Sequence, residues 1–162
     1  MRTYSIIVIT YNNADGLQRT LQSISQLDHA SKEVIVIDGQ SQDNTKDVIS
    51  SYKDVITTFV SEKDYGIYNA MNKGIKLVNG DYVVFMNAGD IFACKDTLTT
   101  VNNYDGGIIL GGETYGGKTR LMKEKMTLYD ILSIGINHQA VYYRKDIIQK
   151  YSSMNHTNSL PT

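Results

Sequence analysis

Cysteine is almost absent from this chain of 162 residues, because Cys94 is its only cysteine. A single cysteine cannot form an intrachain disulfide, and cysteine-based zinc sites need more than one. The sequence therefore belongs neither to the disulfide-stapled secreted domains nor to the zinc-ribbon type. It fits a reducing cytoplasm, and we interpret Cys94 as a small hydrophobic residue.

A charge excess and long apolar runs are also missing. The 16 Lys+Arg residues nearly balance the 17 Asp+Glu residues, and a net charge of −1 does not favour nucleic acid or an anionic membrane as the main partner. The run Ser5–Thr10 is far shorter than the roughly 18–20 residues that span a bilayer, and no small-residue cleavage site follows it. We expect no transmembrane segment, no signal peptide and a cytoplasmic location, with peripheral attachment to the inner membrane left open.

Proline is equally scarce, since Pro161 is the only one and lies in the polar stretch 151–162. We expect this stretch to be a disordered tail. The composition of 41% hydrophobic and 20% charged residues is ordinary for a globular domain, and residues 1–150 contain no linker or internal repeat. The chain is therefore expected to form one domain over 1–150.

Short β-branched runs alternate with helical patterns in the first half, which is typical of β-α units around a mainly parallel sheet. Apolar residues recur at helical spacing over 17–27 and 67–78, and Asp43 is placed to cap a helix that ends near Tyr52. We predict an α/β fold with an open, mainly parallel sheet flanked by helices. The expected strands are 4–10, 33–38, 55–61 and 82–87.

The pattern is weaker in the second half. It predicts a short helix over 96–103, a strand over 107–110, a hairpin or loop over 111–117, a helix over 127–132, a strand over 139–143 and a helical turn from Lys145.

Polar residues follow each of the four early strands, in the loops 10–13, 38–43, 61–64 and 87–90. Such residues are common in ordinary turns and caps, so each loop alone is a weak signal. The carboxyl ends of parallel strands share one edge of a sheet, and ligands of open α/β proteins bind there. Four polar loops at one edge therefore predict a ligand site.

The loop after the first strand reads Thr-Tyr-Asn-Asn-Ala-Asp-Gly over 10–16, which is neither a dinucleotide-binding glycine motif nor a P-loop. A nucleoside diphosphate would have to be neutralised by a divalent metal on oxygen ligands, helped by cations such as Lys63, Lys73 or Arg144. Asn87 and Asp90 offer such oxygens, although Asn-Ala-Gly-Asp is also an ordinary β-turn sequence.

His138 is a further ligand or pyrophosphate contact, or else simply a packed side chain. Its place just before the late strand is compatible with each of these roles.

Several segments together resemble the inverting glycosyltransferases of the large family two, which adopt the Rossmann-like GT-A fold. The segments are 5–12, 34–45, 61–74, 80–82 and 85–90, within a resemblance over about residues 4–146. The segment 61–74, Ser-Glu-Lys-Asp-Tyr-Gly-Ile-Tyr-Asn-Ala-Met-Asn-Lys-Gly, taken together with 80–82 and 85–90, resembles the branch found in bacterial polysaccharide gene clusters, including colanic-acid-type enzymes. The domain over 1–150 would then be the nucleotide-sugar-binding domain.

The resemblance implies a role for each candidate residue. Thr10, Tyr11 and Asn12 would line the nucleoside pocket, and Asp38 would hydrogen-bond the base or ribose. Lys63, Asp64, Asn69 and Lys73 would surround the base, sugar or diphosphate of the donor. Asn87 and Asp90 would occupy the metal region for Mg²⁺ or Mn²⁺, and His138 with Gln139 would lie near the acceptor side.

The sequence departs from the family at two places. Asn87 and Gly89 stand where most relatives have acidic residues, so Asp90 would be the main protein ligand of the metal. Relatives usually continue further and supply the catalytic base from a downstream acidic motif, so the chain reads as C-terminally short. No residue of this chain matches that base, and Glu113, the first glutamate after the metal region, is its in-chain candidate.

The resulting hypothesis is a transferase that moves a sugar, with inversion, from a UDP- or GDP-linked donor to a hydroxyl of a saccharide or lipid-linked acceptor, in cell-surface polysaccharide synthesis. A carboxylate base and a metal-stabilised diphosphate would carry the reaction. The alternative is a catalytically incomplete nucleotide-sugar-binding module. A sugar-activating nucleotidyltransferase is less consistent, because its Gly-rich, Arg/Lys-bearing loop is missing.

Overall fold

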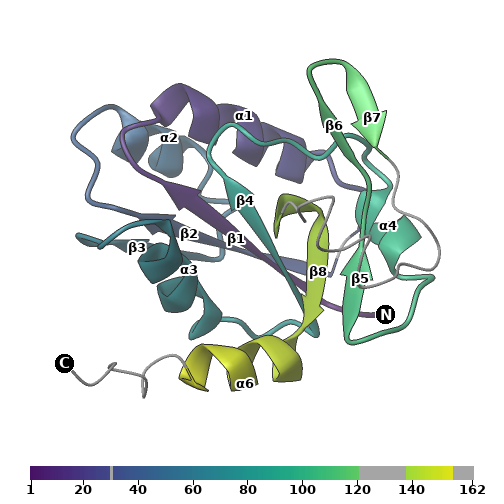
Figure 1. The fold of residues 1–162 in the computed structure, drawn as a ribbon. Coiled ribbons are helices and arrows are strands. Elements are labelled where there is room, and N and C mark those ends of the chain that lie inside the picture. The colour runs from purple at the N-terminus through teal and green to yellow at the C-terminus, as the bar shows by residue number, and fades with distance from the viewer. Residues whose placement is uncertain (30, 121–137, 155–162) are drawn as a thin grey trace.

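The computed structural model describes residues 1–29, 31–120 and 138–154. Its centre is a six-stranded sheet in the order β3-β2-β1-β4-β8-β5 (Figure 1). The strands are β1 (Tyr4–Thr10), β2 (Lys32–Asp38), β3 (Thr58–Ser61), β4 (Tyr82–Asn87), β5 (Ile108–Leu110) and β8 (Val141–Arg144). β3, β2, β1 and β4 are mutually parallel, whereas β8 is antiparallel to both β4 and β5. The predicted mainly parallel α/β sheet is confirmed.

Helices cover both faces of the sheet. They are α1 (Ala14–Ser25), α2 (Thr45–Ser51), α3 (Ile67–Ile75), α4 (Thr97–Val101) and α6 (Lys145–Met154), with a 3₁₀ turn η1 (His138–Ala140) before β8. α1, α2 and α4 pack on one face, and α3 and α6 pack on the other. Connections between parallel strands of one sheet are right-handed. The chain moves in one direction across the sheet from β1 to β3 and in the other direction from β3 to β4. The helix of the last connection, α3, therefore lies on the face opposite to α1 and α2.

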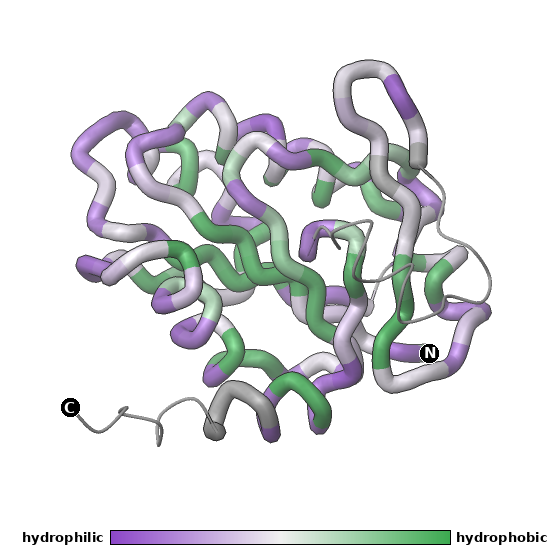
Figure 2. Tube along the Cα trace, viewed as in Figure 1, coloured by the Kyte–Doolittle hydropathy of each residue, from purple (hydrophilic) through white to green (hydrophobic). Residues whose placement is uncertain are grey.

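The core follows from the period of two along the central strand. Ile6 and Val8 of β1 face the layer of α1, while Ile7 and Ile9 face α3, and every residue of β1 is buried. Burial of each such side chain stabilises the fold by roughly 1.5–3 kcal/mol. Figure 2 shows the hydrophobic strands inside a shell of hydrophilic loops. A Cβ on Gly74 would lie 2.6 Å from Ile7, so glycine allows α3 to lie close to β1.

Two local features differ from the sequence prediction. β3 begins at Thr58 rather than at residue 55, because the amides of Val55 and Ile56 both donate to the carbonyl of Tyr52 and close a turn there. Asn44 rather than Asp43 holds the N-cap position of α2. Asp43 instead accepts hydrogen bonds from the amides of Thr45 and Ala14, so its carboxylate joins the starts of α2 and α1.

The second half largely follows the expected pattern. A hairpin of β6 (Glu113–Tyr115) and β7 (Lys118–Arg120) forms where a hairpin or loop was expected. α6 continues past residue 150 to Met154. The helix expected over 127–132, and residues 155–162 of the expected tail, lie outside the described residues. Within the described ranges, no helix is long and apolar enough to cross a bilayer.

Candidate functional site

The strand order places a topological switch point between β1 and β4. From β1 the chain adds β2 and then β3 on one side, and it returns to add β4 on the other side of β1. A cavity of about 310 Å³ lies there, at the carboxyl ends of β1 and β4, where open α/β sheets bind ligands. Its lining consists of Ile9, Thr10, Tyr11, Asn13, Asp64, Gly66, Ile67, Asn87 and Ala88.

Asp38, at the end of β2, is fully buried beneath this edge. Its Oδ2 accepts a hydrogen bond from the hydroxyl of Ser61 at 2.6 Å, and its two oxygens accept the amide of Ser41 at 3.2 Å each. The hydroxyl of Ser41 donates to Oδ1 as well. A buried carboxylate needs such donors. Asp38 therefore holds the loop 38–43 and the end of β3 in place through these hydrogen bonds. The side chain of Asp38 itself is not exposed to solvent.

The loop after β1 is shaped by backbone geometry. Asn12 has a φ of 47°, and its Oδ1 accepts the amide of Gln42 at 2.8 Å while its own amide donates to Ser41 Oγ at 2.8 Å. A Cβ on Gly39 would lie 2.7 Å from Asp64 Oδ2 and 3.1 Å from a ring carbon of Tyr11. Only glycine therefore lets Tyr11 and Asp64 converge above the end of β2.

Residues 62–73 form the opposite wall. Asp64 Oδ1 accepts the amide of Gly66 at 3.1 Å, and Gly66 has a φ of 104°, which favours glycine. Lys73 donates from Nζ to the carbonyl of Lys63 at 2.8 Å and pairs with Glu62 at 3.1 Å. Lys73 thus fixes the loop, whereas the side chain of Lys63 is exposed.

Asn69, on α3, supports the same wall. Its Oδ1 accepts the amide of Tyr65 at 3.4 Å, so it lies next to the cavity lining without belonging to it.

Residues 87–90 form a closed turn, which we call the 87–90 turn. The amide of Asp90 donates to the carbonyl of Asn87 at 2.9 Å, and Asp90 Oδ2 accepts the amide of Asn87 at 2.9 Å. Gly89 has a φ of 112°. The expected β-turn is therefore present, and it directs a carboxylate and an amide toward the edge that holds the cavity.

Two oxygens of this turn are suited to a hard cation. Among the described residues, Asn87 Oδ1 is a buried acceptor without a hydrogen-bond partner, and no hydrogen bond is found to Asp90 Oδ1. The described residues contain no group of three His, Cys, Asp or Glu that could bind a metal by itself. A cation at this turn would therefore need further oxygens from a diphosphate or water.

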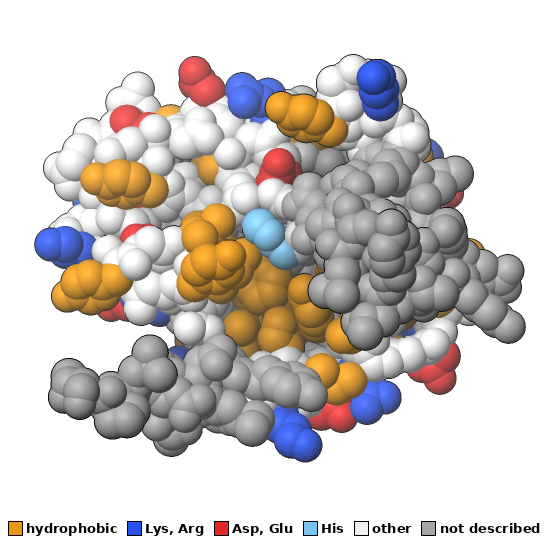
Figure 3. All heavy atoms as spheres, in the orientation of Figure 1, with side chains coloured by type: hydrophobic (Ala, Val, Ile, Leu, Met, Phe, Trp, Pro, Cys, Tyr) orange, Lys and Arg blue, Asp and Glu red, His pale blue; other side chains and the backbone are white. Residues whose placement is uncertain are grey.

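His138 and Gln139 approach the turn from η1. Gln139 Nε2 donates to Asp90 Oδ2 at 2.8 Å, and His138 Nε2 lies 3.5 Å from Asn87 Nδ2. Burial lowers the pKa of His138 below its ordinary value, and the nearby Asp90 only partly offsets this. His138 is therefore mainly neutral at neutral pH. Figure 3 shows a histidine at the middle of this face, bordered by hydrophobic side chains.

The structure thus brings Thr10, Tyr11, Asp64 and Asn87 together in the cavity lining. Asp90 and His138 contact or adjoin Asn87 from outside it, and Asn12, Asp38, Lys63, Asn69 and Lys73 build the surrounding loops.

Several residues that shape the site received no individual role from the sequence. Asn13 caps α1 by accepting the amide of Gly16 at 3.1 Å and donates to the carbonyl of Ala88 at 2.8 Å. Thr20 is buried against the 87–90 turn. The sequence indicated it only as a polar residue beside Leu17 and Leu21 on the apolar stripe of α1. Ser41 and Ser61 lie in the predicted polar loops 38–43 and 61–64, but nothing in the sequence distinguished them from their polar neighbours.

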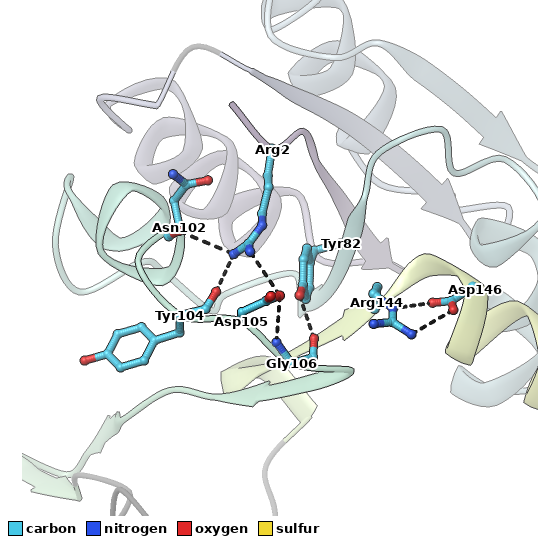
Figure 4. A network of polar contacts seen from close by, with 8 residues as sticks. All are labelled: Arg2, Tyr82, Asn102, Tyr104, Asp105, Gly106, Arg144 and Asp146. Atoms are coloured by element: carbon cyan, nitrogen blue, oxygen red, sulfur yellow. Dashed lines mark hydrogen bonds and ion pairs between the residues drawn. The ribbon is translucent and has the colours of Figure 1, made fainter.

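The expectation that Arg144 helps to bind phosphate is wrong. β8 runs antiparallel to β4, so its carboxyl end pairs with Tyr82 at the amino end of β4. Arg144 there donates to both carboxylate oxygens of Asp146, at 2.7 and 2.9 Å (Figure 4). A larger cavity of about 890 Å³ lies at this opposite edge, lined in part by Arg2 and Asp105.

We place the functional site at the smaller cavity rather than at this larger one. The larger cavity faces the amino ends of β1 and β4, away from the polar loops, and its Arg2 is already paired with Asp105 at 3.1 Å.

Glu113 begins β6, opposite Arg120 in the hairpin register. Its expected role as a base stays a prediction.

Comparison with known proteins agrees with this geometry. The model of Glycosyl transferase family 2 matches residues 5–146. An uncharacterized glycosyltransferase of Mycobacterium tuberculosis is 38% identical over 97 residues, covering 59% of this chain and 37% of the relative. The poly-beta-1,6-N-acetyl-D-glucosamine synthase of Staphylococcus epidermidis is 30% identical over 132 residues, covering 80% of this chain and 32% of the relative. The chain thus spans only about a third of either relative.

Solved structures show the same fold. S. aureus TarS 1-349 in complex with UDP-GlcNAc superposes with a TM-score of 0.76 at 20% identity, covering 92% of this chain and 47% of that one. The mannosyltransferase PcManGT of Pyrobaculum calidifontis, in complex with GDP-Man and Mn²⁺, gives 0.73 at 19%, covering 93% and 46%. With a GT-A sheet and a family match over most of its length, this chain belongs to glycosyltransferase family 2.

Proposed function

We propose that this chain binds a nucleoside-diphosphate sugar and contributes to transfer of the sugar to an acceptor hydroxyl. The observation that carries the proposal is the cavity at the switch point, where Thr10, Tyr11, Asp64 and Asn87 converge from separate segments. Ligand sites of α/β proteins occupy this position, and pockets with a few convergent polar groups are typical of small-molecule sites. Family membership supports the same activity.

In the proposed complex, the nucleoside lies between the loops that follow β1 and β3. Tyr11 is 63% exposed, so its ring is available to stack on a base, and Asp64 presents a carboxylate beside it above Gly39. Thr10 has a buried hydroxyl without a partner among the described residues. The hydrogen bonds that Asp38 accepts from Ser41 and Ser61 support an indirect role, in which this carboxylate holds the loop that contacts the base or ribose.

The diphosphate would lie toward the 87–90 turn. Asp90 and Asn87 offer the oxygens that would hold a Mg²⁺ or Mn²⁺, and when bound this cation would neutralise the departing diphosphate. Lys63 is an exposed cation near the same edge, and Lys73 keeps its loop in place. Arg19, also exposed, reaches the turn, with Nη2 3.8 Å from the Cβ position of Gly89.

The acceptor hydroxyl would attack the anomeric carbon from the face opposite the diphosphate, which inverts the configuration. Neutral His138 and Gln139 line the approach to Asp90 and would orient the acceptor or the diphosphate. A general base accepts the hydroxyl proton, and we propose that this base is a carboxylate. Glu113 is the candidate within the described residues. If Glu113 is not the base, this chain alone is a catalytically incomplete module that binds the nucleotide sugar.

The biological setting is proposed from relatives. A synthase of poly-beta-1,6-N-acetyl-D-glucosamine is among them, which supports a saccharide or lipid-linked acceptor in cell-surface polysaccharide synthesis, in the colanic-acid-type branch that segment 61–74 resembles. The UDP-GlcNAc and GDP-Man bound by the two structural neighbours support a UDP- or GDP-linked donor.

Titration calorimetry of the purified chain with UDP- and GDP-sugars, with and without Mn²⁺, tests this function. We expect binding that Mn²⁺ strengthens, and saturable release of the nucleoside diphosphate if the chain carries its own base. Binding without release or transfer would support the module. Absence of binding to every donor would contradict both.

A further inference from the structure

Thr20, on α1, holds the 87–90 turn from inside the protein. Its side chain is fully buried, and its Oγ1 accepts the amide of Gly89 at 2.9 Å. The hydroxyl proton has one best acceptor, the carbonyl of Asp90 at 2.7 Å, since the carbonyls of Gly16 and Asn87 are more distant at 3.1 and 3.4 Å. One hydroxyl thus satisfies both a donor and an acceptor of the turn.

The turn needs this support because its own backbone is permissive. Gly89 has a φ of 112° and no Cβ, so it can adopt many alternative conformations. Asn13 contributes a neighbouring contact from the start of α1 by donating to the carbonyl of Ala88 at 2.8 Å. α1 therefore fixes three consecutive residues of the turn, and Thr20 accounts for two of them.

We infer that Thr20 is a positioning residue for the cation and diphosphate bound at Asp90, an inference that rests on the proposed function. Loss of the hydroxyl would leave the Gly89 amide and the Asp90 carbonyl, both in a partly buried turn, without their Thr20 partner. The turn would relax to satisfy them, and the Asp90 carboxylate would move relative to the cavity. Thr20 itself is too deeply buried to contact a ligand.

The test is the gain in UDP affinity on addition of Mn²⁺, measured by titration calorimetry, with GDP in parallel. We expect Thr20→Val, which keeps the side-chain shape, to reduce this gain about tenfold, the effect typical of an outer-shell partner of a metal ligand. Affinity without Mn²⁺ should stay within about twofold of the wild type. Thr20→Ser restores the hydroxyl and should restore most of the gain.

Ser5→Ala is the matched control. Ser5 is also fully buried, accepts a glycine amide, that of Gly80 at 2.9 Å, and donates to an oxygen, that of Glu33, but it does so at the opposite edge of the sheet. We expect it to lower the melting temperature as Thr20→Val does and to leave the Mn²⁺ gain unchanged. This separates positioning from a general loss of stability.

The outcomes separate the two hypotheses. A wild-type gain that Thr20→Val leaves intact would overturn the role of Thr20 and keep the metal site. Equal losses in Thr20→Val and Ser5→Ala would overturn it too, because the effect would then be general. No Mn²⁺ gain in the wild type, with UDP or GDP, would overturn the metal site and this inference with it. Should Thr20→Val not fold, Thr20→Cys replaces it, because a thiol is a weak donor and acceptor.

Discussion

Asp38 and Ser61 are joined by a 2.6 Å hydrogen bond from the serine hydroxyl to the buried carboxylate, which ties the end of β2 to the end of β3. Together with Ser41, this bond fills the oxygens of Asp38 with donors. Asp38, the acidic residue that ends the second predicted strand, therefore supports the loops around the site from inside the protein.

Asp38→Asn should therefore destabilise the fold. The amide nitrogen would face hydrogen-bond donors, and we expect the free energy of unfolding to fall by about 3 kcal/mol, with weaker nucleotide binding as a consequence. Urea denaturation measures the change. Asp81→Asn, at an exposed carboxylate that accepts the Thr3 amide at 2.8 Å, is the control and should cost much less. Equal, small losses in both variants would show that the Asp38 network is not needed.

Gly39→Ala should lower nucleotide affinity without lowering the stability of the fold. The new Cβ would lie 2.7 Å from Asp64 Oδ2, the mobile end of a side chain, so Asp64 can move away at little cost in stability. We expect nucleotide affinity to fall by about tenfold, which corresponds to about 1.4 kcal/mol, with a nearly unchanged melting temperature. Gly106→Ala, whose Cβ would meet nothing closer than 3.5 Å, should change neither. Wild-type affinity in Gly39→Ala would remove Asp64 from the nucleoside pocket.

His138 predicts a pH dependence of stability. Burial lowers its pKa in the folded state, with Asp90 acting in the opposite direction, so the unfolded chain binds the proton more readily. Its contribution to stability is full above the unfolded value of about 6.5 and falls as pH decreases from there toward the lower folded pKa. His138→Gln should make the melting temperature less dependent on pH between about 7.5 and 5.5. Parallel melting curves for both proteins would contradict this.

Asp90→Ala should weaken donor binding by a few kcal/mol, and only when Mn²⁺ is present, because the charged ligand of the proposed cation is lost. Calorimetry with and without Mn²⁺ measures this difference. Asp146→Ala removes an exposed carboxylate that pairs with Arg144 at the opposite edge, and it should leave both affinities unchanged. An Mn²⁺ effect of full size in Asp90→Ala would exclude Asp90 as a ligand.

The sequence was most informative where periodicity and turn chemistry acted together. The continuous Ile/Val runs of β1 and β2 identified buried parallel strands, and the polar residues after them marked the edge that holds the cavity. The two late strands show the limit. A strand pattern does not encode direction, and the antiparallel pairing of β8 with β4 moved Arg144 to the far edge.

Side-chain roles were harder to predict, because they depend on contacts between distant segments. Asp38 and Asp90 look alike in sequence, each an acidic residue near the end of a buried strand. Asp38 is fully buried because it is paired on both sides, with Thr10 of β1 and Ser61 of β3, whereas Asp90 lies in the turn after β4 and is only partly buried. Thr20 could be noticed only as a polar residue on an apolar stripe.

A crystal of the chain with UDP and Mn²⁺, recorded for the anomalous signal of manganese, would show whether the cation and diphosphate bind at the 87–90 turn. We expect a manganese peak at coordination distance from the Asp90 carboxylate, with the diphosphate beside it and the uracil between Tyr11 and Asp64. A nucleotide bound instead in the cavity of Arg2 and Arg144, or manganese away from Asp90, would contradict it.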